Sequence, residues 1–245
     1  MQKTISILRA PMDLGAGVRG AGLGAEAIMK ARLRSQLSGL PLEIEDAGTL
    51  DVPAGVYRTA TSRLKYLEHV RDFNIRLSKK ISELISRKRF PLVLGGDHSI
   101  SIGTIAGVSQ HYDNLGVLWV DAHGDLNTAE TSPTGNIHGM SLAVSLGKGD
   151  STLTSIGNAQ TKVKPANVVI VGARDLDEGE RKWIQEAGIN CFTMHDIDRL
   201  GMATIMEKAF EKIAANTDGV HLSFDIDSVD PSEAPGTGTP VKGGL

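Results

Sequence analysis

Residues 116–125 read GVLWVDAHGD, an apolar run that ends in two aspartates and a histidine. Residues 117–120 are apolar throughout, which is typical of a strand buried on both faces of a parallel sheet. The runs at 92–94 and 168–171 show the same pattern. Since such runs alternate with helical patterns along the chain, the sequence predicts an α/β fold with a mainly parallel central sheet.

Seven strands and five helices are expected in all. The expected strands are 4–8, 41–45, 91–96, 116–123, 167–173, 190–194 and 220–227, and the expected helices lie near 25–37, 59–88, 99–111, 178–187 and 202–215. We find no internal repeat and no domain boundary, so residues 1–245 are expected to form a single domain. In open α/β sheets the ligand crevice lies beyond the carboxyl ends of the strands.

The composition narrows the class of protein. The net charge is −3, so there is no excess of basic charge to bind nucleic acid. Hydrophobic residues make up 40% of the chain and charged residues 22%, a globular balance. Cys191 is the one cysteine, which excludes an internal disulfide and a Cys-rich zinc site. With neither a signal peptide nor an apolar run of about 20 residues, we expect a cytoplasmic protein that does not contact membranes.

Three of the expected strand ends carry acidic and imidazole side chains. These are Asp97 and His98 after 91–94, Asp121, His123 and Asp125 after 116–120, and Asp225 and Asp227 after 220–224. If the chain stays extended, Asp121, His123 and Asp125 share one face, because side chains alternate along a strand. Parallel strand ends meet at one edge of the sheet, so all these groups are expected to lie close together.

The charge at this edge favours metal binding. Four aspartates in a buried crevice would carry a charge of −4, which would force protonation or a large repulsion. Two divalent cations would balance it. Oxygen and imidazole ligands without thiolate suit Mn²⁺, with Fe²⁺, Co²⁺, Ni²⁺ or Zn²⁺ possible by substitution. The alternative is that these aspartates only cap the helices that follow; three strand ends with the same chemistry favour a binuclear metal site.

Other motifs are weaker. Residues 15–20 read GAGVRG and match G-x-G-x-x-G, but six residues separate the preceding strand from Gly15, whereas a dinucleotide site needs a tight turn there. We therefore expect a flexible loop at the crevice. Asp97 either supports the metal site from behind or caps a helix. The long polar loop 124–139 is expected to be functional, because loops of this length in a compact domain usually are.

The blocks GGDHSISIGT, WVDAHGDLNT, TGNIHG and SFDIDSVDPSEAPGTGTP resemble the signature blocks of the ureohydrolases, the arginase/agmatinase family, from about Ile5 to Leu245. The resemblance implies a three-layer α/β/α fold around an eight-stranded parallel sheet. It also implies two Mn²⁺ ions, hydrolysis of a guanidinium compound to urea and an amine, and a homo-oligomer, a trimer or hexamer.

Within the family, the loop from Asn127 to Gly139 is similar to the arginase loop that reads L-arginine. The implied reaction is hydrolysis of L-arginine to L-ornithine and urea by a metal-bridging hydroxide. Because APGTGTP at 234–240 is also agmatinase-like, agmatine or another guanidino compound is the alternative substrate.

The resemblance also assigns roles to individual residues. The implied metal ligands are His98, Asp121, His123, Asp125, Asp225 and Asp227. The implied catalytic residues are His138, as a proton shuttle, and Asp125. The implied substrate-binding residues are Asn127, Thr134 and Asn136 at the α-carboxylate, Asp177 with Glu180 beside it at the α-amino group, and Thr239 in support of the catalytic site.

One part of the family pattern is not found in the sequence. The family has an eighth strand, an acidic residue that pairs with the guanidinium, and a C-terminal helix, all beyond the position of Leu245. We therefore expect a C-terminally truncated domain with an exposed apolar edge at 220–227. A non-catalytic metal-binding fragment is the corresponding alternative function.

Overall fold

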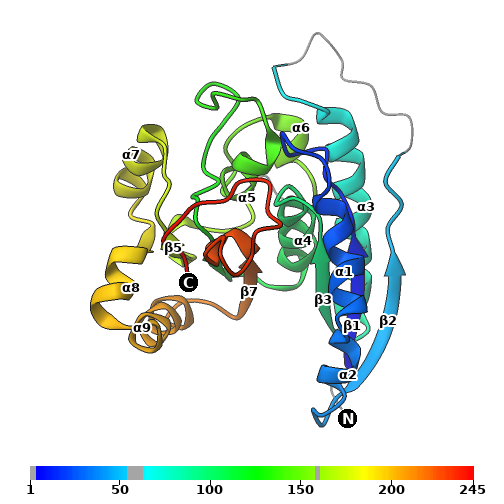
Figure 1. The fold of residues 1–245 in the computed structure, drawn as a ribbon. Coiled ribbons are helices and arrows are strands. Elements are labelled where there is room, and N and C mark those ends of the chain that lie inside the picture. Colours follow the sequence, from blue (N-terminus) through cyan, green and yellow to red (C-terminus); the bar gives the residue numbers. More distant parts are fainter. Residues whose placement is uncertain (1–3, 54–62, 158–160) are drawn as a thin grey trace.

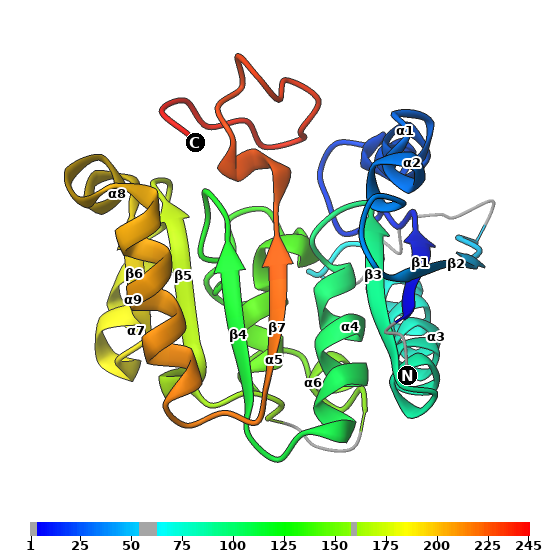
Figure 2. The ribbon, with the colours of Figure 1, turned by 90° about the horizontal axis from the view of Figure 1, so that it is seen from below.

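The computed structural model describes residues 4–53, 63–157 and 161–245, which contain seven parallel strands in two sheets (Figure 2). The first sheet has the order β2-β1-β3, and the second has the order β6-β5-β4-β7. The strands are β1 (Thr4–Ala10), β2 (Glu43–Thr49), β3 (Arg89–Gly95), β4 (Leu115–Val120), β5 (Val168–Ala173), β6 (Asn190–Thr193) and β7 (Gly219–Phe224). All seven expected strands are therefore confirmed, and every pairing between them is parallel.

Helices cover both faces of the sheets, as the three-layer expectation requires (Figure 1). In the first half, α1 (Gly24–Lys30) and α2 (Leu33–Leu37) cover one face, and α3 (Leu67–Ser86) and α4 (Ile100–Val108) cover the other. In the second half, α8 (Met194–Leu200) and α9 (Met202–Ala214) lie opposite α5 (Ser141–Ser145) and α7 (Glu178–Ala187). The remaining short elements are α6 (Ser151–Thr154) and the 3₁₀ turns Ala21–Leu23, Ser109–His111, Ile137–Met140, Pro165–Asn167 and Ile226–Ser228.

Strand β4 is the centre of the second sheet. All six of its residues are buried, and it pairs in parallel with β5 on one side and β7 on the other. Val117 and Trp119 pack against the α7 layer, while Leu118 and Val120 pack against α9. This burial on both faces explains the unbroken apolar run in the sequence.

The expected sheet and helix limits need correction in several places. The described strands form two sheets rather than one, since β3 and β7 are not hydrogen-bonded to each other. The helix expected at 25–37 is broken into α1 and α2 by Arg32, whose φ is +67°. The helix expected at 59–88 is α3 over Leu67–Ser86, and its expected start at 59–62 lies outside the described residues. The short helices α5, α6 and α8 were not expected.

The strand ends beside the acidic residues also differ from expectation. Strand β4 ends at Val120 rather than at residue 123, and β7 ends at Phe224 rather than at residue 227. In both places an aspartate side chain accepts a backbone N–H two residues later: Asp121 from His123 at 2.7 Å, and Asp225 from Asp227 at 2.9 Å. Such turns end a strand, so the expectation of one extended face through Asp125 was wrong.

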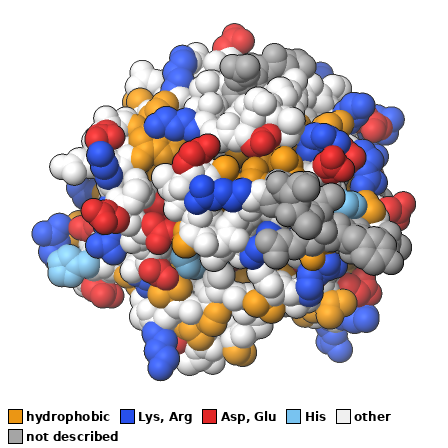
Figure 3. Space-filling model, turned by 90° about the horizontal axis from the view of Figure 1, so that it is seen from above, with side chains coloured by type: hydrophobic (Ala, Val, Ile, Leu, Met, Phe, Trp, Pro, Cys, Tyr) orange, Lys and Arg blue, Asp and Glu red, His pale blue; other side chains and the backbone are white. Residues whose placement is uncertain are grey.

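Both signs of charge occur over the molecular surface. On the face shown in Figure 3, Lys and Arg side chains are interspersed with Asp and Glu side chains. Within the described residues, we find no helix that has the length and apolar character needed to cross a membrane.

One face of β7 exposes apolar side chains. Leu222 pairs with Leu118 of β4, and Phe224 pairs with Val120, so these residues share the face that α9 covers over β4 and β5. On β7 that cover is lacking among the described residues, and Val220, Leu222 and Phe224 are 46%, 59% and 54% exposed. Exposed apolar strands of this kind promote association between chains.

We therefore expect Val220→Thr with Leu222→Thr to reduce self-association of the 245-residue chain. Threonine keeps a strong strand preference. Covering these two half-exposed side chains is worth about 2 kcal/mol in total, or roughly 30-fold in an association constant. Sedimentation velocity over a concentration series measures the change, and Leu200→Thr on α8 is the control. Association of the double variant as strong as that of the parent would contradict the expectation.

Candidate metal centre

The centre begins with His98, which lies between the end of β3 and the start of α4. Its ring stacks on the indole of Trp119, with the centroids 4.0 Å apart and the planes at 11°. Nε2 lies 2.7 Å from Oγ of Ser223 on β7. This arrangement directs Nδ1 toward three carboxylates, at 2.9 Å from Asp121 Oδ2 and 3.1 Å from Oδ2 of both Asp125 and Asp225.

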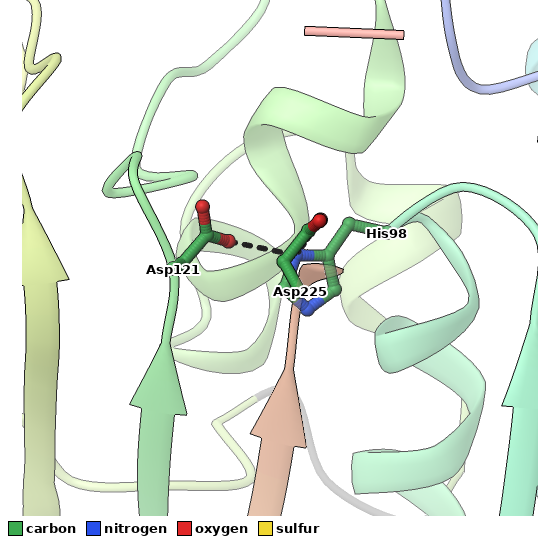
Figure 4. A group of neighbouring side chains, drawn as sticks. All are labelled: His98, Asp121 and Asp225. Atoms are coloured by element: carbon green, nitrogen blue, oxygen red, sulfur yellow. Dashed lines mark ion pairs between the residues drawn. The ribbon is translucent and has the colours of Figure 1, made fainter. Parts of the chain in front are cut away.

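Asp121 and Asp225 reach the same point from neighbouring strands. Figure 4 shows Asp121 beyond the tip of β4 and Asp225 beyond the tip of β7, with the His98 ring next to them. One possible ligand atom from each of the three residues lies within 4.8 Å of the others. The backbone N–H of Asp225 donates to the carbonyl of Val120 at 2.9 Å, which holds the two strand ends together.

A second group adjoins the first and shares Asp121. His123 Nδ1 lies 3.4 Å from Asp121 Oδ1 and 3.1 Å from Asp227 Oδ2. Asp121, His123 and Asp227 again offer ligand atoms within 4.8 Å of one another. Asp121 therefore stands between two sets of nitrogen and oxygen donors, and the six side chains expected as ligands are brought to one place.

The electrostatics of the centre are those of crowded, buried carboxylates. Burial raises the pKa of Asp121, and the charge of Asp225 raises it further. Burial, followed by the charge of Asp121, raises the pKa of Asp125 to about 8. Burial alone would lower the pKa of His123, but contacts with Asp121 and Asp227 outweigh it and raise this pKa to about 11. The protonated His123 thus offsets part of the negative charge of the carboxylates.

The donor set fits a pair of divalent cations. His98 Nδ1 and Asp125 Oδ2 are buried and form no hydrogen bond of good geometry, although they lie 3.1 Å apart and Nδ1 also faces Asp121 and Asp225. Buried polar atoms rarely lack partners unless another group satisfies them. Both atoms face the space among the carboxylates, and oxygen and imidazole donors without thiolate are the set expected for Mn²⁺. The site therefore carries excess negative charge, and its facing ligand atoms are poorly satisfied by hydrogen bonds within the protein.

Residues expected at the substrate's α-amino and α-carboxylate groups lie in the adjoining loops. Asn127 Nδ2 donates to Asp177 Oδ2 at 2.7 Å. The residue expected at the α-carboxylate is therefore in contact with the residue expected at the α-amino group. The buried Glu180 accepts the backbone N–H of Asp177 and of Leu126, both at 2.9 Å. Glu180 therefore fixes the start of α7 against the 124–139 loop.

The outer part of that loop packs against residues 15–20. Asn136 Oδ1 accepts a hydrogen bond from Lys65 Nζ at 2.7 Å, and Thr134 Oγ1 accepts the backbone N–H of Asn136 at 3.2 Å. The backbone N–H of His138 donates to the carbonyl of Gly15 at 3.1 Å. The G-x-G-x-x-G segment is thus a loop beside the site, as expected.

Thr239 contacts the second ligand group. Its hydroxyl donates to Asp227 Oδ2 at 3.0 Å. Asp97, by contrast, lies outside both ligand groups: its carboxylate accepts the backbone N–H of Ser99 at 2.9 Å and of Ala16 at 3.0 Å. These contacts organise the turn before α4; they do not make Asp97 the cap of α4, because the N-cap residue is Ser99.

Sequence reasoning missed residues that support the ligands. Trp119 stacks on His98 and also donates from Nε1 to Asp121 Oδ2 at 3.0 Å. Ser223 holds the other side of the His98 ring. A signal existed, because Trp119 precedes Asp121 by two residues and Ser223 precedes Asp225 by two, which places each pair on one strand face. Lys65 offered no such signal, since it meets Asn136 from 71 residues away.

The fold and the site define a class of protein, an α/β protein with a candidate metal centre at the carboxyl edge of parallel strands. The sequence model of the arginase family matches residues 3–245 of this chain. An arginase of Bacillus subtilis (strain 168) is 54% identical, over 100% of this chain and 82% of its own length. The structure of Bacillus caldovelox arginase has a TM-score of 0.95 at 52% identity, covering 100% of this chain and 82% of that one.

A more distant structure agrees. The arginase of Entamoeba histolytica, solved in complex with L-ornithine, has a TM-score of 0.92 at 36% identity, covering 100% of this chain and 83% of that one. The chain therefore belongs to the arginase family. It is a hydrolase that acts on a guanidino C–N bond, as the family resemblance in the sequence implied.

We expect metal binding at pH 7 to release about one proton or more per chain, because metal ligands must give up their protons. Without a cation, the raised pKa values of Asp125, about 8, and His123, about 11, keep both groups protonated at this pH. Titration calorimetry with Mn²⁺ in buffers of different ionisation enthalpy counts the protons. Asp125→Asn should release fewer than the parent, and an enthalpy of binding independent of the buffer would contradict this account.

Proposed function

We propose that this protein hydrolyses L-arginine to L-ornithine and urea at a centre that holds two Mn²⁺ ions. The observation that carries the proposal is the position of Asp121, which belongs to both the His98 group and the His123 group. Two adjacent donor sets with one shared carboxylate suit two ions side by side. Support also comes from the relatives, which bear the name arginase, and from the relative solved with L-ornithine.

In this proposal the ligands are the six side chains His98, Asp121, His123, Asp125, Asp225 and Asp227. When bound, such ions would supply Lewis acidity and a water of lowered pKa. Asp125 has a second task as a catalytic residue. Its Oδ2 lies among the ligands, at 3.1 Å from His98 Nδ1.

His138 is the proposed proton shuttle for the departing amine. Burial, and next the positive charge of His98, lower the pKa of His138 to about 4, so its imidazole is neutral at pH 7. A neutral imidazole can accept a proton and pass it on within one turnover. The backbone bond from His138 to Gly15 fixes the turn that presents the ring.

The amino-acid end of the substrate is read by the loops above the metal centre. We propose that Asn127, Thr134 and Asn136 bind the α-carboxylate, with Lys65 adding positive charge at Asn136. Asp177 accepts the α-amino group, supported by Glu180, and Thr239 supports the catalytic site through Asp227. The 2.7 Å contact between Asn127 and Asp177 supports this reading, because a donor beside a carboxylate suits a group that carries both charges.

Asn127→Ala and Asn136→Ala should each raise KM for L-arginine by roughly 10- to 100-fold. Each removes a hydrogen bond to a charged group, worth about 1.5–3 kcal/mol. Agmatine has no α-carboxylate, so its hydrolysis should hardly change. Steady-state urea release from both substrates is the measurement. Thr128→Ala in the same loop is the matched control, and a uniform loss on both substrates would show that the asparagines only hold the loop together.

The rival substrate is agmatine, or another guanidino compound without an α-carboxylate. Urea release from L-arginine and from agmatine by the parent protein separates the two. The proposal requires a higher kcat/KM for L-arginine, and equal or higher values for agmatine would refute it. Mn²⁺ binding without urea from either compound would identify a non-catalytic metal-binding protein.

The cellular setting follows from the same proposal. We infer a cytoplasmic enzyme of arginine metabolism in which residues 1–245 belong to one ureohydrolase domain. We further infer that the intact protein assembles as a homo-oligomer, a trimer or hexamer. Light scattering coupled to size exclusion measures the assembly state, and a protein that remains monomeric at micromolar concentration would contradict that part.

A further inference from the structure

We propose that Arg174 positions the second ligand group of the metal centre by binding the backbone of the loop that carries Asp227. The inference rests on the proposed function, because it assumes that the His123 group holds an ion. Arg174 follows directly after β5, and its side chain reaches under the loop that runs from the end of β7 to Leu245. It is absent from the set of ligands and substrate contacts described above.

The guanidinium of Arg174 is fully used in binding carbonyl oxygens. It has five N–H donors, and each has an acceptor. The acceptors are the carbonyls of Asp227 at 2.6 Å, Val241 at 2.7 Å, Ser228 at 3.2 Å, Lys242 at 3.3 Å and Gly172 at 3.4 Å. Among the described residues no carboxylate forms an ion pair with Arg174. Four of the five bonds go to one loop, so this side chain fixes the path of that loop.

The backbone of the same residue is tied to the other ligand loop. The N–H groups of Arg174 and Asp175 both donate to the carbonyl of Ala122, at 2.9 and 3.0 Å. Ala122 lies between the ligands Asp121 and His123, and its own N–H donates to Asp227 Oδ1 at 3.3 Å. Arg174 therefore joins the loop after β4 to the loop after β7, which are the two loops that build the second group.

The far part of the loop is closed by Asp230. Its carboxylate accepts the backbone N–H of Gly243 at 2.7 Å and of Gly244 at 3.2 Å. Gly244 packs so closely that an added Cβ would lie 2.7 Å from Arg174 Nη2. This closure brings Val241 and Lys242 back over the guanidinium, so the loop and Arg174 form one clamp around the backbone of Asp227.

The clamp acts on one half of the centre. Asp227 Oδ2 contacts His123 and Thr239, at 3.1 and 3.0 Å, and Asp227 belongs to the second ligand group only. The first group has other supports, because Trp119 and Ser223 hold His98. Loss of the Arg174 hydrogen bonds should therefore weaken binding of the second ion selectively. A purely structural role of Arg174 would not weaken binding of one ion more than the other.

Titration calorimetry of Mn²⁺ into Arg174→Lys tests the inference, at a temperature well below the melting point of the variant. Lysine keeps the charge but cannot fork to five carbonyls. We expect the Kd of the second ion to rise about 10- to 100-fold, the usual effect of losing a residue that hydrogen-bonds a metal-binding segment. The Kd of the first ion should stay within about twofold. Arg199→Lys on α8, where Arg199 pairs with Asp196 at 3.5 Å, is the matched control and should change neither.

Binding of both ions to Arg174→Lys as in the parent, even with a lowered melting point, overturns the inference and leaves the proposed function standing. Fewer than two ions in the parent itself overturns the proposed function and this inference with it. If Arg174→Lys does not fold, Gly244→Ala must raise the Kd of the second ion in the same way, because its Cβ would lie within 2.7 Å of Asp230 N, Ser228 O and Arg174 Nη2 and would push the loop away from the guanidinium. Unchanged binding of both ions to Gly244→Ala would then refute the clamp.

Discussion

Repulsion among four aspartates at one buried edge of the sheet is the constraint on which the rest of this site depends. The pKa of Asp121 is raised, and that of Asp125 is raised to about 8, because burial and neighbouring negative charge disfavour their ionised forms. Two histidines with raised pKa values offset part of this charge. Divalent cations would offset it more fully, because they add charge without needing protons. The arrangement is therefore costly without metal and suited to metal.

The surroundings of the carboxylates follow from this constraint. Hydrogen-bond donors hold the carboxylates in place: Trp119 Nε1 binds Asp121, backbone N–H groups bind Asp121 and Asp225, and Thr239 binds Asp227. The turns that end β4 and β7 come from the same side chains. Because parallel strands end at a single edge, loops from both halves of the fold can then reach the centre with the groups that would read a substrate.

Much of this was predictable from the sequence. Buried strands are local patterns, so all seven were found, and strand-end aspartates and histidines identified the residues that meet. The expected backbone conformation was wrong beyond the strand ends. There Asp121 and Asp225 turn the backbone, and Asp125 adopts a φ of +49°. Arg174 and Lys65 could not be found, because they act on residues 53 to 71 positions away and belong to no local pattern. Arg32 breaks one expected helix with a positive φ, and an arginine gives no sequence signal for a turn.

In the proposed centre, Asp121 stands between two metal ions. Anomalous X-ray scattering at the manganese edge, from crystals of the Mn²⁺-loaded protein, tests it most directly. We expect two peaks per chain, one beside His98 and Asp225 and the other beside His123 and Asp227, with Asp121 bound to both. A single peak, or two peaks of which only one contacts Asp121, would contradict it.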